Sequence, residues 1–382
     1  MAGIYVHIPY CSQRCVYCDF YFVTSRKSRA TFLRSLNIES EHYAHLYAGS
    51  EPIRTIYFGG GTPSRLSLEE LHGILATIHE HFDVSQIEEV TLEANPEDLD
   101  GVYLRGLLGI GITRLSVGIQ SFYEDDLQFM NRAHSSDQAR EIAPQISSAG
   151  FETFTADLIF GIPDQPREYW AANLERAVQQ RIPHISAYSL TVERETPLFK
   201  MIQNGVSKPV DDETTAERFR FTMQYLRESG YEHYEVSSYA LPGHRAVHNQ
   251  SYWGHENYLG FGPSAHSFWR DGSTVRRWAN IRNLKRYQAL LEGRNQPVEF
   301  SEVLEPETLA NEHIMLKLRT SDGLDLSVLD EQYGFDLYDE RVEDLALLEG
   351  EDLIMPIRND RVVLTDEGMI LCDMVTSKLM LG

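Results

Sequence analysis

The 382-residue sequence predicts an α/β fold, in which an open (β/α)6 partial barrel is followed by a small helical, winged-helix-like C-terminal domain. Six short apolar, β-rich runs alternate with amphipathic helical stretches, which is typical of βα units on a parallel sheet. Glycine and polar residues follow these strands at their C-terminal ends, where a barrel or doubly wound sheet assembles its binding site. The pattern favours the open barrel and leaves the strand order undetermined.

The barrel strands and helices can be placed along the first half of the chain. Two capping boxes, Ser67-x-x-Glu70 and Ser135-x-x-Gln138, mark helix starts, because the serine and the side chain three residues later satisfy each other's backbone N–H groups. The strands are expected at residues 4–8, 55–58, 89–92, 114–119, 153–160 and 184–190, and the helices at 29–47, 67–81, from 135 onward and at 167–180.

The second half of the chain predicts a different organisation. A linker at 293–297 separates a first domain, residues 1–292, from a second domain, residues 298–382. The expected elements are a helix at 211–230, a strand at 231–239, an aromatic and histidine-rich loop at 248–269, helices at 306–319, 338–349 and 366–381, and a hairpin at 353–364 that turns at Arg358-Asn359-Asp360.

Net charge and the distribution of apolar residues argue against two classes of protein, nucleic-acid-binding and membrane-spanning. The formal net charge is −23 at pH 7, which argues against a nucleic-acid partner, because such a partner needs a basic surface. There is no run of 18 apolar residues, so no transmembrane segment is expected. No targeting peptide precedes the first expected strand, and a cytoplasmic location is therefore the expectation.

Three of the four cysteines, Cys11, Cys15 and Cys18, lie on one loop with the spacing C-x3-C-x2-C. A disulfide is disfavoured for an odd cluster without a secretory signal, whereas structural zinc stays an alternative that would normally require four ligands. The remaining Cys372 lies in an expected C-terminal helix, where a buried small apolar residue is the ordinary role. The loop therefore favours a [4Fe–4S] cluster with one open iron, at which a small molecule can bind.

Several strand ends carry residues that suit a ligand better than packing. The run 59–61 is three glycines, which let a backbone approach a ligand closely, and Glu93, Gln120 and Asp157 end later strands. Each could alone be a turn, a helix cap or a structural hydrogen-bonding group. Together with the cysteine loop they predict one binding site at the mouth of the barrel.

The cysteine spacing, with Tyr17 directly before the last cysteine, resembles the signature of the radical S-adenosylmethionine (SAM) superfamily. Further matches, which span residues 4–163, resemble oxygen-independent coproporphyrinogen III oxidase and its relatives. These matches are I-Y-V-H-I-P-Y-C, G-G-G-T-P, L-E-A-N-P, G-I-Q-S, M-N-R and A-D-L-I-F-G-I-P.

This resemblance implies a radical SAM type of barrel and a set of cofactor contacts. The three cysteines would hold the [4Fe–4S] cluster, which an electron donor would reduce. The SAM contacts that it implies are Gly60, Gly61 and Thr62 at the methionine amino group, Glu93 at the ribose, and Tyr5, Tyr17, Gln120, Arg132 and Asp157 around the pocket.

Two departures from the oxidase resemble instead the HemW branch of haem chaperones. Phe20 stands where the oxidase has a further cysteine, and only Met1 and Ala2 precede the first strand. The run that begins H-N-Q-S-Y-W at His248 also resembles a motif associated with haem binding in that branch, although packing is the alternative for so aromatic a stretch. By this resemblance His248 is the first candidate for the haem ligand, and His255 and His266 are further candidates.

The branch resemblance implies a protein that binds haem and transfers it to acceptor haem proteins, such as membrane-bound respiratory enzymes. The alternative is an enzyme that decarboxylates coproporphyrinogen III to protoporphyrinogen IX with a 5′-deoxyadenosyl radical. A radical SAM enzyme that acts on another small substrate is a third hypothesis. The sequence therefore leaves open whether the chain is an enzyme.

Overall fold

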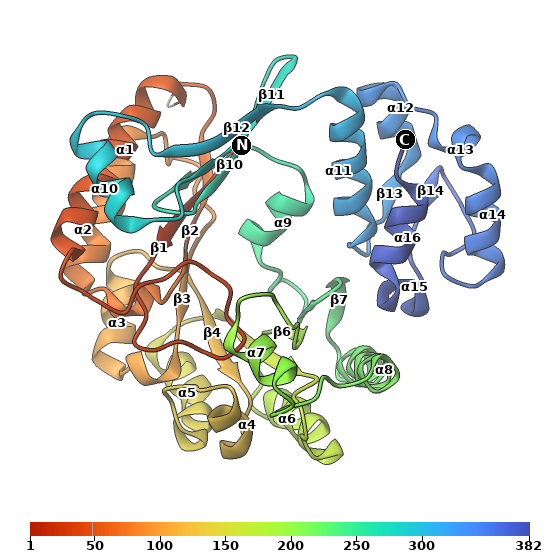
Figure 1. The fold of residues 1–382 in the computed structure, drawn as a ribbon, viewed down its shortest axis with the longest axis horizontal. Helices are drawn as coiled ribbons and strands as arrows, with labels where there is room; N and C mark the ends of the chain where they lie inside the picture. Colours follow the sequence, from red (N-terminus) through yellow and green to blue (C-terminus); the bar gives the residue numbers. More distant parts are fainter. Residues whose placement is uncertain (48) are drawn as a thin grey trace.

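The computed structural model describes residues 1–47 and 49–382, and its centre is one large open sheet (Figure 1). Within these residues the strand order is β12-β11-β10-β9-β1-β2-β3-β4-β5-β6-β8-β7, and the two edge strands do not pair with each other. The six predicted barrel strands are β1 (Ala2–Ile8), β2 (Ile53–Gly60), β3 (Glu89–Ala94), β4 (Arg114–Gln120), β5 (Thr153–Phe160) and β6 (His184–Ser189). They pair in parallel and in sequence order, so the open (β/α)6 barrel is confirmed.

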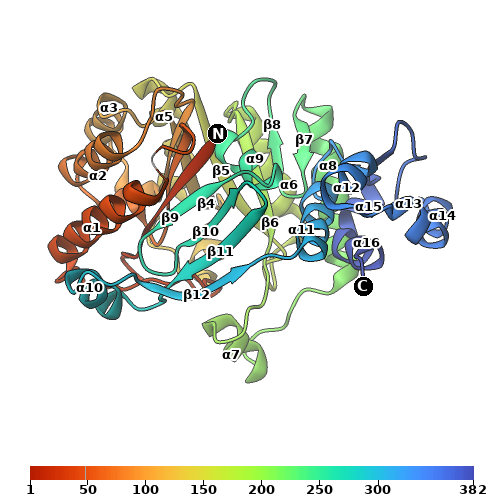
Figure 2. The same ribbon diagram turned by 90° about the horizontal axis from the view of Figure 1, so that it is seen from above.

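Helices cover the outer face of these strands (Figures 1 and 2). The helices of the barrel are α1 (Arg29–Tyr47), α2 (Leu68–His81), α3 (Gly101–Gly109), α4 (Glu124–Phe129), α5 (Ser136–Ala149) and α6 (Arg167–Gln179), with short 3₁₀ turns at Pro63–Arg65 and Pro96–Asp98. Both predicted capping boxes form, at the starts of α2 and α5. No helix among the described residues is long and apolar enough to cross a membrane.

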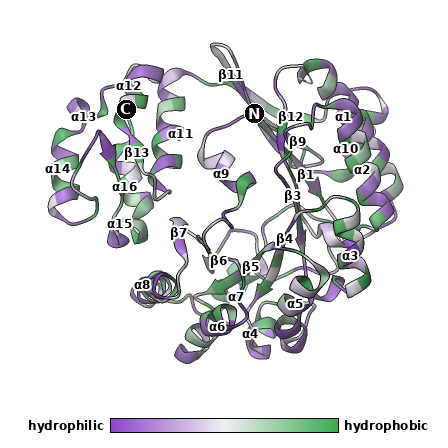
Figure 3. Ribbon diagram, turned by 180° about the vertical axis from the view of Figure 1, so that it is seen from behind, coloured by the Kyte–Doolittle hydropathy of each residue, from purple (hydrophilic) through white to green (hydrophobic). Residues whose placement is uncertain are grey.

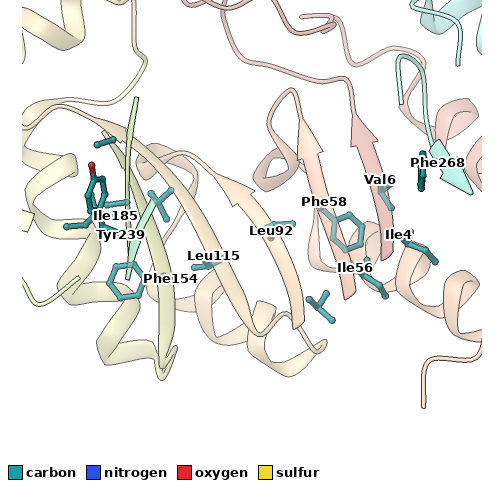
Figure 4. Close-up of a cluster of buried hydrophobic side chains, with 14 of the residues drawn as sticks. Ile4, Val6, Ile56, Phe58, Leu92, Leu115, Phe154, Ile185, Tyr239 and Phe268 are labelled. Atoms are coloured by element: carbon teal, nitrogen blue, oxygen red, sulfur yellow. The ribbon is translucent and has the colours of Figure 1, made fainter. Parts of the chain in front are cut away.

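Successive side chains of each barrel strand point alternately outward, into the packed core, and inward, toward the cavity. Ile56 and Phe58 are buried in the core with Ile4 and Val6 of the neighbouring strand (Figure 4). Tyr57, between them, lines the cavity inside the barrel. Because side chains alternate along a strand, one strand serves both the packed outer layer and the inner wall. The helices carry hydrophobic and hydrophilic residues on different sides, as expected for this layer (Figure 3).

The strand predicted at 231–239 is wrong in one respect, because it is a hairpin of two strands. After α7 (Pro197–Gln203) and α8 (Asp212–Glu228), the chain forms β7 (Glu232–Glu235) and β8 (Ser238–Ala240). These two strands pair antiparallel, and β8 pairs with β6 at one edge of the sheet. The turn between them is Val236 and Ser237, which contains no glycine or proline to mark it in the sequence.

The loop predicted at 248–269 is also wrong, because this stretch is mostly regular structure. It forms α9 (Val247–Trp253), β9 (Tyr258–Phe261) and β10 (His266–Asp271), followed by β11 (Thr274–Asn280), α10 (Leu284–Glu292) and β12 (Val298–Val303). Strand β9 pairs in parallel with β1, and β10, β11 and β12 continue the sheet antiparallel. Helix α9 packs against β2 and β3, and Figure 1 shows it inside the curve of the sheet.

The C-terminal region is helical, with a small two-stranded sheet. Its elements are α11 (Pro306–Leu318), β13 (Leu324–Asp325), α12 (Leu326–Tyr333), α13 (Leu337–Glu340), α14 (Val342–Gly350), β14 (Arg361–Val362), α15 (Asp366–Ile370) and α16 (Cys372–Leu379). The helices predicted at 338–349 and 366–381 are each divided in two, at Arg341 and at Leu371. The predicted turn is present, since Asn359 and Asp360 both have positive φ, as in a type I′ hairpin.

The division into domains at 293–297 stays a prediction. Strand β12 follows this segment directly and is the edge strand of the large sheet, so residues 298–303 pair with β11. Cys372 is buried at 4 % exposure in the C-terminal region, which agrees with a packing role.

Candidate functional site

A cavity of about 500 Å³ opens at the C-terminal ends of the barrel strands. It gathers residues from the cysteine loop and from β2, β3, β4 and β5. The predicted site residues that line it are Cys11, Cys15, Tyr17, Cys18, Gly60, Gly61, Thr62, Glu93, Gln120, Arg132 and Asp157. Of the remaining candidates, Tyr5 and His248 lie behind this wall, and His255 and His266 are also absent from the cavity lining.

The cysteine loop is held by the segment that follows α4. The side chain of Gln13 donates to the carbonyl of Asn131 at 2.9 Å, and Asn131 donates back to the carbonyl of Arg14 at 2.7 Å. The backbone of Val16 donates to the carbonyl of Met130 at 3.1 Å. The M-N-R stretch therefore fixes the path of the loop, and it also delivers Arg132 to the cavity.

The three thiols share the cavity wall and have specific donors. Thr62 Oγ1 donates to Cys11 Sγ at 3.4 Å, and Arg132 Nη1 donates to Cys15 Sγ at 3.4 Å. Burial raises the pKa of Cys11 to about 11 and that of Cys18 to about 12. A bound metal must displace the thiol protons, because the thiolate is the ligand form.

The donor set fits an iron–sulfur cluster. It offers three soft sulfur ligands with open cavity beside them, which leaves one iron position free for a small molecule. In residues 1–47 and 49–382, no three His, Cys, Asp or Glu side chains converge closely enough to hold a single metal ion. The second position after the last cysteine is occupied by Phe20, which is 65 % exposed and lines the cavity.

Arg132 ties the cysteine loop to the barrel wall. Its Nη2 donates to Asn95 Oδ1 at 2.6 Å and to the carbonyl of Gly118 at 2.8 Å, and its Nη1 reaches the hydroxyl of Tyr17 at 3.4 Å. Burial lowers the pKa of Arg132, but Tyr17 and Cys15 raise it overall, so the guanidinium stays charged.

The glycines at the end of β2 stand where a side chain would collide with β1 and the residues that follow it. A Cβ on Gly61 would lie 2.7 Å from the carbonyl oxygen of Ile8, and one on Gly60 would lie 2.5 Å from the ring of His7. Gly60 also has a φ of 103°, a conformation that side chains rarely adopt. Gly60 and Gly61 line the cavity with backbone atoms only, which allows the close approach of a ligand.

Two partly buried carboxyl groups face the cavity from β3 and β5. Glu93 Oε1 accepts a hydrogen bond from the hydroxyl of Tyr57 at 2.8 Å, and its Oε2 accepts one from the backbone of Gly60 at 3.1 Å. Asp157 accepts from Ser116 at 3.0 Å. Burial raises the pKa of Glu93 to about 6 and that of Asp157 to about 7, so both carboxyl groups change charge near neutral pH.

Gln120 is held in a strained conformation at the end of β4. Its φ is 65°, in the left-handed region, and its Oε1 is buried without a hydrogen-bond partner among the described residues. Such strain and an unpaired buried acceptor are costly for the fold and are typical of ligand sites.

Tyr5 and His248 lie one layer behind the cavity. Tyr5 stacks on Tyr57 with ring centroids 6.1 Å apart, and its hydroxyl lies 3.2 Å from His7 Nδ1. The side chain of His248 is buried, with Nδ1 2.8 Å from Thr55 Oγ1 and Nε2 2.9 Å from the hydroxyl of Tyr252. The haem-ligand role of His248 stays a prediction, and it would require the ring to leave both partners.

The cavity wall includes residues that the sequence did not single out. Among them are Tyr57, Asn95, Arg114, Ser116 and Asn249. Tyr57 could have been found from the alternation of β2, because it shares a face with Gly59 and lies opposite to Ile56 and Phe58. Asn249 carries no such signal, since its position depends on how α9 enters the barrel.

Two family models match separate parts of the chain. Residues 5–177 match the Radical SAM superfamily, and residues 304–371 match the HemN C-terminal domain. The first range covers the cysteine loop and the strand ends of the cavity, and the second covers most of the C-terminal helices.

Curated relatives match over nearly the whole chain. The heme chaperone HemW of Mycobacterium tuberculosis (strain ATCC 25618 / H37Rv) is 34 % identical, over 99 % of this chain and 94 % of its own length. The chain belongs to the HemW family. HemW of Lactococcus lactis subsp. lactis (strain IL1403) is 32 % identical, over 99 % of this chain and 97 % of that protein, and HemW of Bacillus subtilis (strain 168) is 31 % identical, over 97 % of each.

The fold of this HemW family member is also that of a solved radical SAM structure. Coproporphyrinogen III oxidase (HemN) from Escherichia coli superposes with a TM-score of 0.85, over 99 % of this chain and 90 % of that chain, at 22 % identity. This likeness establishes the shared fold. The predicted membership of the radical SAM superfamily and of the HemW branch is thus confirmed, and the superfamily implies a [4Fe–4S] cluster and SAM.

Proposed function

We propose that this chain is a haem chaperone, which binds haem and transfers it to acceptor haem proteins from a radical SAM core. The observation that carries the proposal is the likeness, over nearly the full length, to three relatives named heme chaperone HemW. Phe20, in place of the further cysteine of the oxidase pattern, supports the same branch.

Within this proposal, Cys11, Cys15 and Cys18 hold the cluster in the cavity. A [4Fe–4S] cluster with an open iron would supply a low-potential electron to a SAM molecule bound at that iron. Arg132 holds Cys15 and orients the loop, and the exposed backbone of Gly60 and Gly61 accommodates the methionine end of SAM with Thr62 beside it.

The remaining cavity residues would hold the rest of SAM. Glu93 would accept hydrogen bonds from the ribose hydroxyls, and Gln120 and Asp157 would complete the polar wall. The hydroxyl of Tyr17 accepts from Arg132 in the same wall. Burial of these groups excludes water and strengthens each hydrogen bond. Tyr5 acts from behind, through its stacking on Tyr57.

The rim of the same site offers an exposed histidine for haem. His266 begins β10 with its side chain exposed, and it pairs with Ala279 of β11, which pairs with Phe300 of β12. Directly paired residues share a sheet face, so the imidazole and the 49 % exposed ring of Phe300 lie on one face. Arg282, after β11, donates to the carbonyl of Asp19, so this rim adjoins the cysteine loop. An open imidazole beside an apolar wall is what haem ligation needs.

The test begins with anaerobic reconstitution of the cluster. One half of the sample is titrated with haem by absorbance, and the other half is given coproporphyrinogen III, SAM and reductant. The expected result is stoichiometric haem binding without a porphyrin product. Formation of protoporphyrinogen IX without specific haem binding would overturn the proposal and make the chain an oxidase.

The ligand is identified by repeating the haem titration with His266→Ala and His248→Ala. Loss of the ligated-haem absorbance in His266→Ala alone would place haem on the β10–β12 face. Loss in His248→Ala alone would confirm the sequence prediction instead. Two variants that both bind haem like the parent would exclude both histidines as ligands.

A further inference from the structure

Helix α9 forms part of the inner wall, and two adjacent residues of its H-N-Q-S-Y-W motif face different surroundings. Asn249 lines the cavity. His248 points away and is 1 % exposed. The start of the helix is fixed by the buried carboxylate of Glu89, which accepts from the backbone of Val247 at 3.1 Å and of His248 at 3.0 Å. The position of the His248 ring against β2 is therefore set by the backbone.

The ring of His248 is confined on every side. It stacks on Tyr57 with centroids 4.9 Å apart and planes at 24°, and it meets Tyr252 edge to face. Its Cε1 lies close enough to β1 that a Cβ on Gly3 would approach it to 3.3 Å. Burial lowers the pKa of His248 to about 3, so the ring is neutral and its two nitrogens pair with Thr55 and Tyr252.

Tyr57 connects this ring to the cavity. One face of Tyr57 packs on His248, Tyr5 stacks on it at 6.1 Å, and its hydroxyl donates to Glu93 at 2.8 Å. The chain of contacts therefore runs from His248 to Tyr57 through ring stacking, and from Tyr57 to Glu93 through a hydrogen bond. No solvent intervenes at the first link, because His248 is fully enclosed.

We propose that His248 is a positioning residue for the SAM site, which acts through Tyr57 to hold the carboxylate of Glu93. The inference rests on the proposed function, because that function assigns Glu93 to the ribose of SAM. The proposal thus assigns the histidine of this motif a role in SAM binding. Outer partners of this kind orient the groups that touch a ligand without touching it themselves.

The test uses the charge of Glu93 as a reporter. Its pKa is raised to about 6 by burial, and the Tyr57 hydroxyl and the Gly60 N–H oppose this rise. Loss of the Tyr57 donor should therefore raise the pKa further, so that SAM binding weakens at a higher pH than in the parent. Several other titratable groups lie close enough to Glu93 that its charge raises their pKa values, although burial is the larger cause in each. They are Tyr5, Tyr57, Asp157, Tyr188, Tyr252 and Cys11.

The variants are His248→Ala, His248→Phe, Tyr57→Phe and the double variant His248→Ala/Tyr57→Phe, all as reconstituted holo-protein. The control is His313→Ala, because His313 is also a buried histidine, with a pKa lowered by burial to about 4, but lies on α11 outside the cavity wall. SAM affinity is measured anaerobically by calorimetry across pH 6 to 9, and haem stoichiometry is measured beside it.

We expect His248→Ala and Tyr57→Phe each to weaken SAM binding about ten-fold, because each disturbs a hydrogen bond to a buried carboxylate. Both should move the pH midpoint upward, and the double variant should be little weaker than either single variant, as residues of one chain of contacts behave. His248→Phe keeps the stacking and should lose less than His248→Ala. His313→Ala should match the parent in affinity and midpoint.

The outcomes separate this inference from the proposed function. Parent-like SAM affinity and pH midpoint in His248→Ala and His248→Phe would overturn the inference, as would additive losses in the double variant. Loss of haem binding alone in His248→Ala would make His248 the haem ligand instead. A parent protein that takes up no haem would refute the chaperone function, while the His248 and Tyr57 shifts would still establish the positioning role. If His248→Ala fails to fold, Tyr57→Phe tests the link to Glu93 on its own, and parent-like SAM affinity and pH midpoint in Tyr57→Phe would then overturn the inference.

Discussion

Glu39 ties helix α1 to the extension of the sheet, and its replacement by glutamine tests how that extension is held. Its side chain is fully buried and accepts hydrogen bonds from the backbone of Gly262 at 2.8 Å, from Asn280 and from the hydroxyl of Tyr287. These three partners follow β9, end β11 and lie on α10. Glu39 therefore joins α1 to three segments of the sheet extension that carries His266.

Burial raises the pKa of Glu39 to about 7 from its ordinary 4.5, although the three donors oppose the rise. The folded chain thus holds this proton more tightly than the unfolded chain. The stability from Glu39 is fully present below pH 4.5 and is lost as the pH rises through 7. A shift of about 2.5 units corresponds to about 3 kcal/mol in total, of which about 2 kcal/mol falls between pH 5.5 and 8.5.

The assay is urea unfolding of the apo-protein at pH 5.5 and 8.5, with the parent, Glu39→Gln and Glu41→Gln. Glu41 is the matched control, because it lies on the same helix in an exposed ion pair with Arg294. Glutamine cannot ionise, so the free energy of unfolding of Glu39→Gln should gain about 2 kcal/mol on the parent between the two pH values. Parallel pH dependences of the parent and Glu39→Gln would refute the argument and show that Glu39 stays ionised in the fold.

Three further predictions concern the cavity. Cys15→Ser should lose the iron content and the visible absorbance of the reconstituted cluster while the far-ultraviolet circular dichroism is retained, and a variant that keeps both would exclude Cys15 as a ligand. Arg132→Lys should speed the loss of the cluster to a chelator, because an ammonium group cannot span Asn95, Gly118 and Cys15 as the guanidinium does, at a cost of about 2 kcal/mol. Gln120→Gly should raise the unfolding free energy by about 1 kcal/mol, because it relieves the left-handed strain, and weaken SAM binding; a loss of stability would contradict the strain argument.

The sequence predicted the barrel well because its local signals agree with one another. Strands β1 to β6 are apolar runs bounded by turns, and the capping boxes at Ser67 and Ser135 mark two helix starts. The structure adds the strand order: each strand pairs in parallel with the next one along the chain. The cysteines and the strand-end residues could be assigned to one cavity, because parallel strands bring their C-terminal ends together.

The extension of the sheet could not be predicted in the same way. Strand β9 pairs with β1, which lies more than 250 residues earlier in the chain, for example through Tyr258 and Gly3. The sequence around Tyr258 contains no signal that would predict pairing with β1. The helix breaks at Arg341 and Leu371 also have no signal in the sequence, since neither position is a glycine or proline.

The aromatic content of the H-N-Q-S-Y-W stretch suggested a loop and obscured its helical spacing. As a loop, its aromatic residues suggest a wall for a flat ligand. As a helix, His248 and Tyr252 are four residues apart and must share a face, and the structure places their polar atoms 2.9 Å apart on that face. The same period turns Asn249 toward the cavity. A histidine whose helical neighbour already binds its Nε2 is poorly placed to give that nitrogen to iron, so the haem-binding association of the motif and the ligand of the haem are separate questions in this chain.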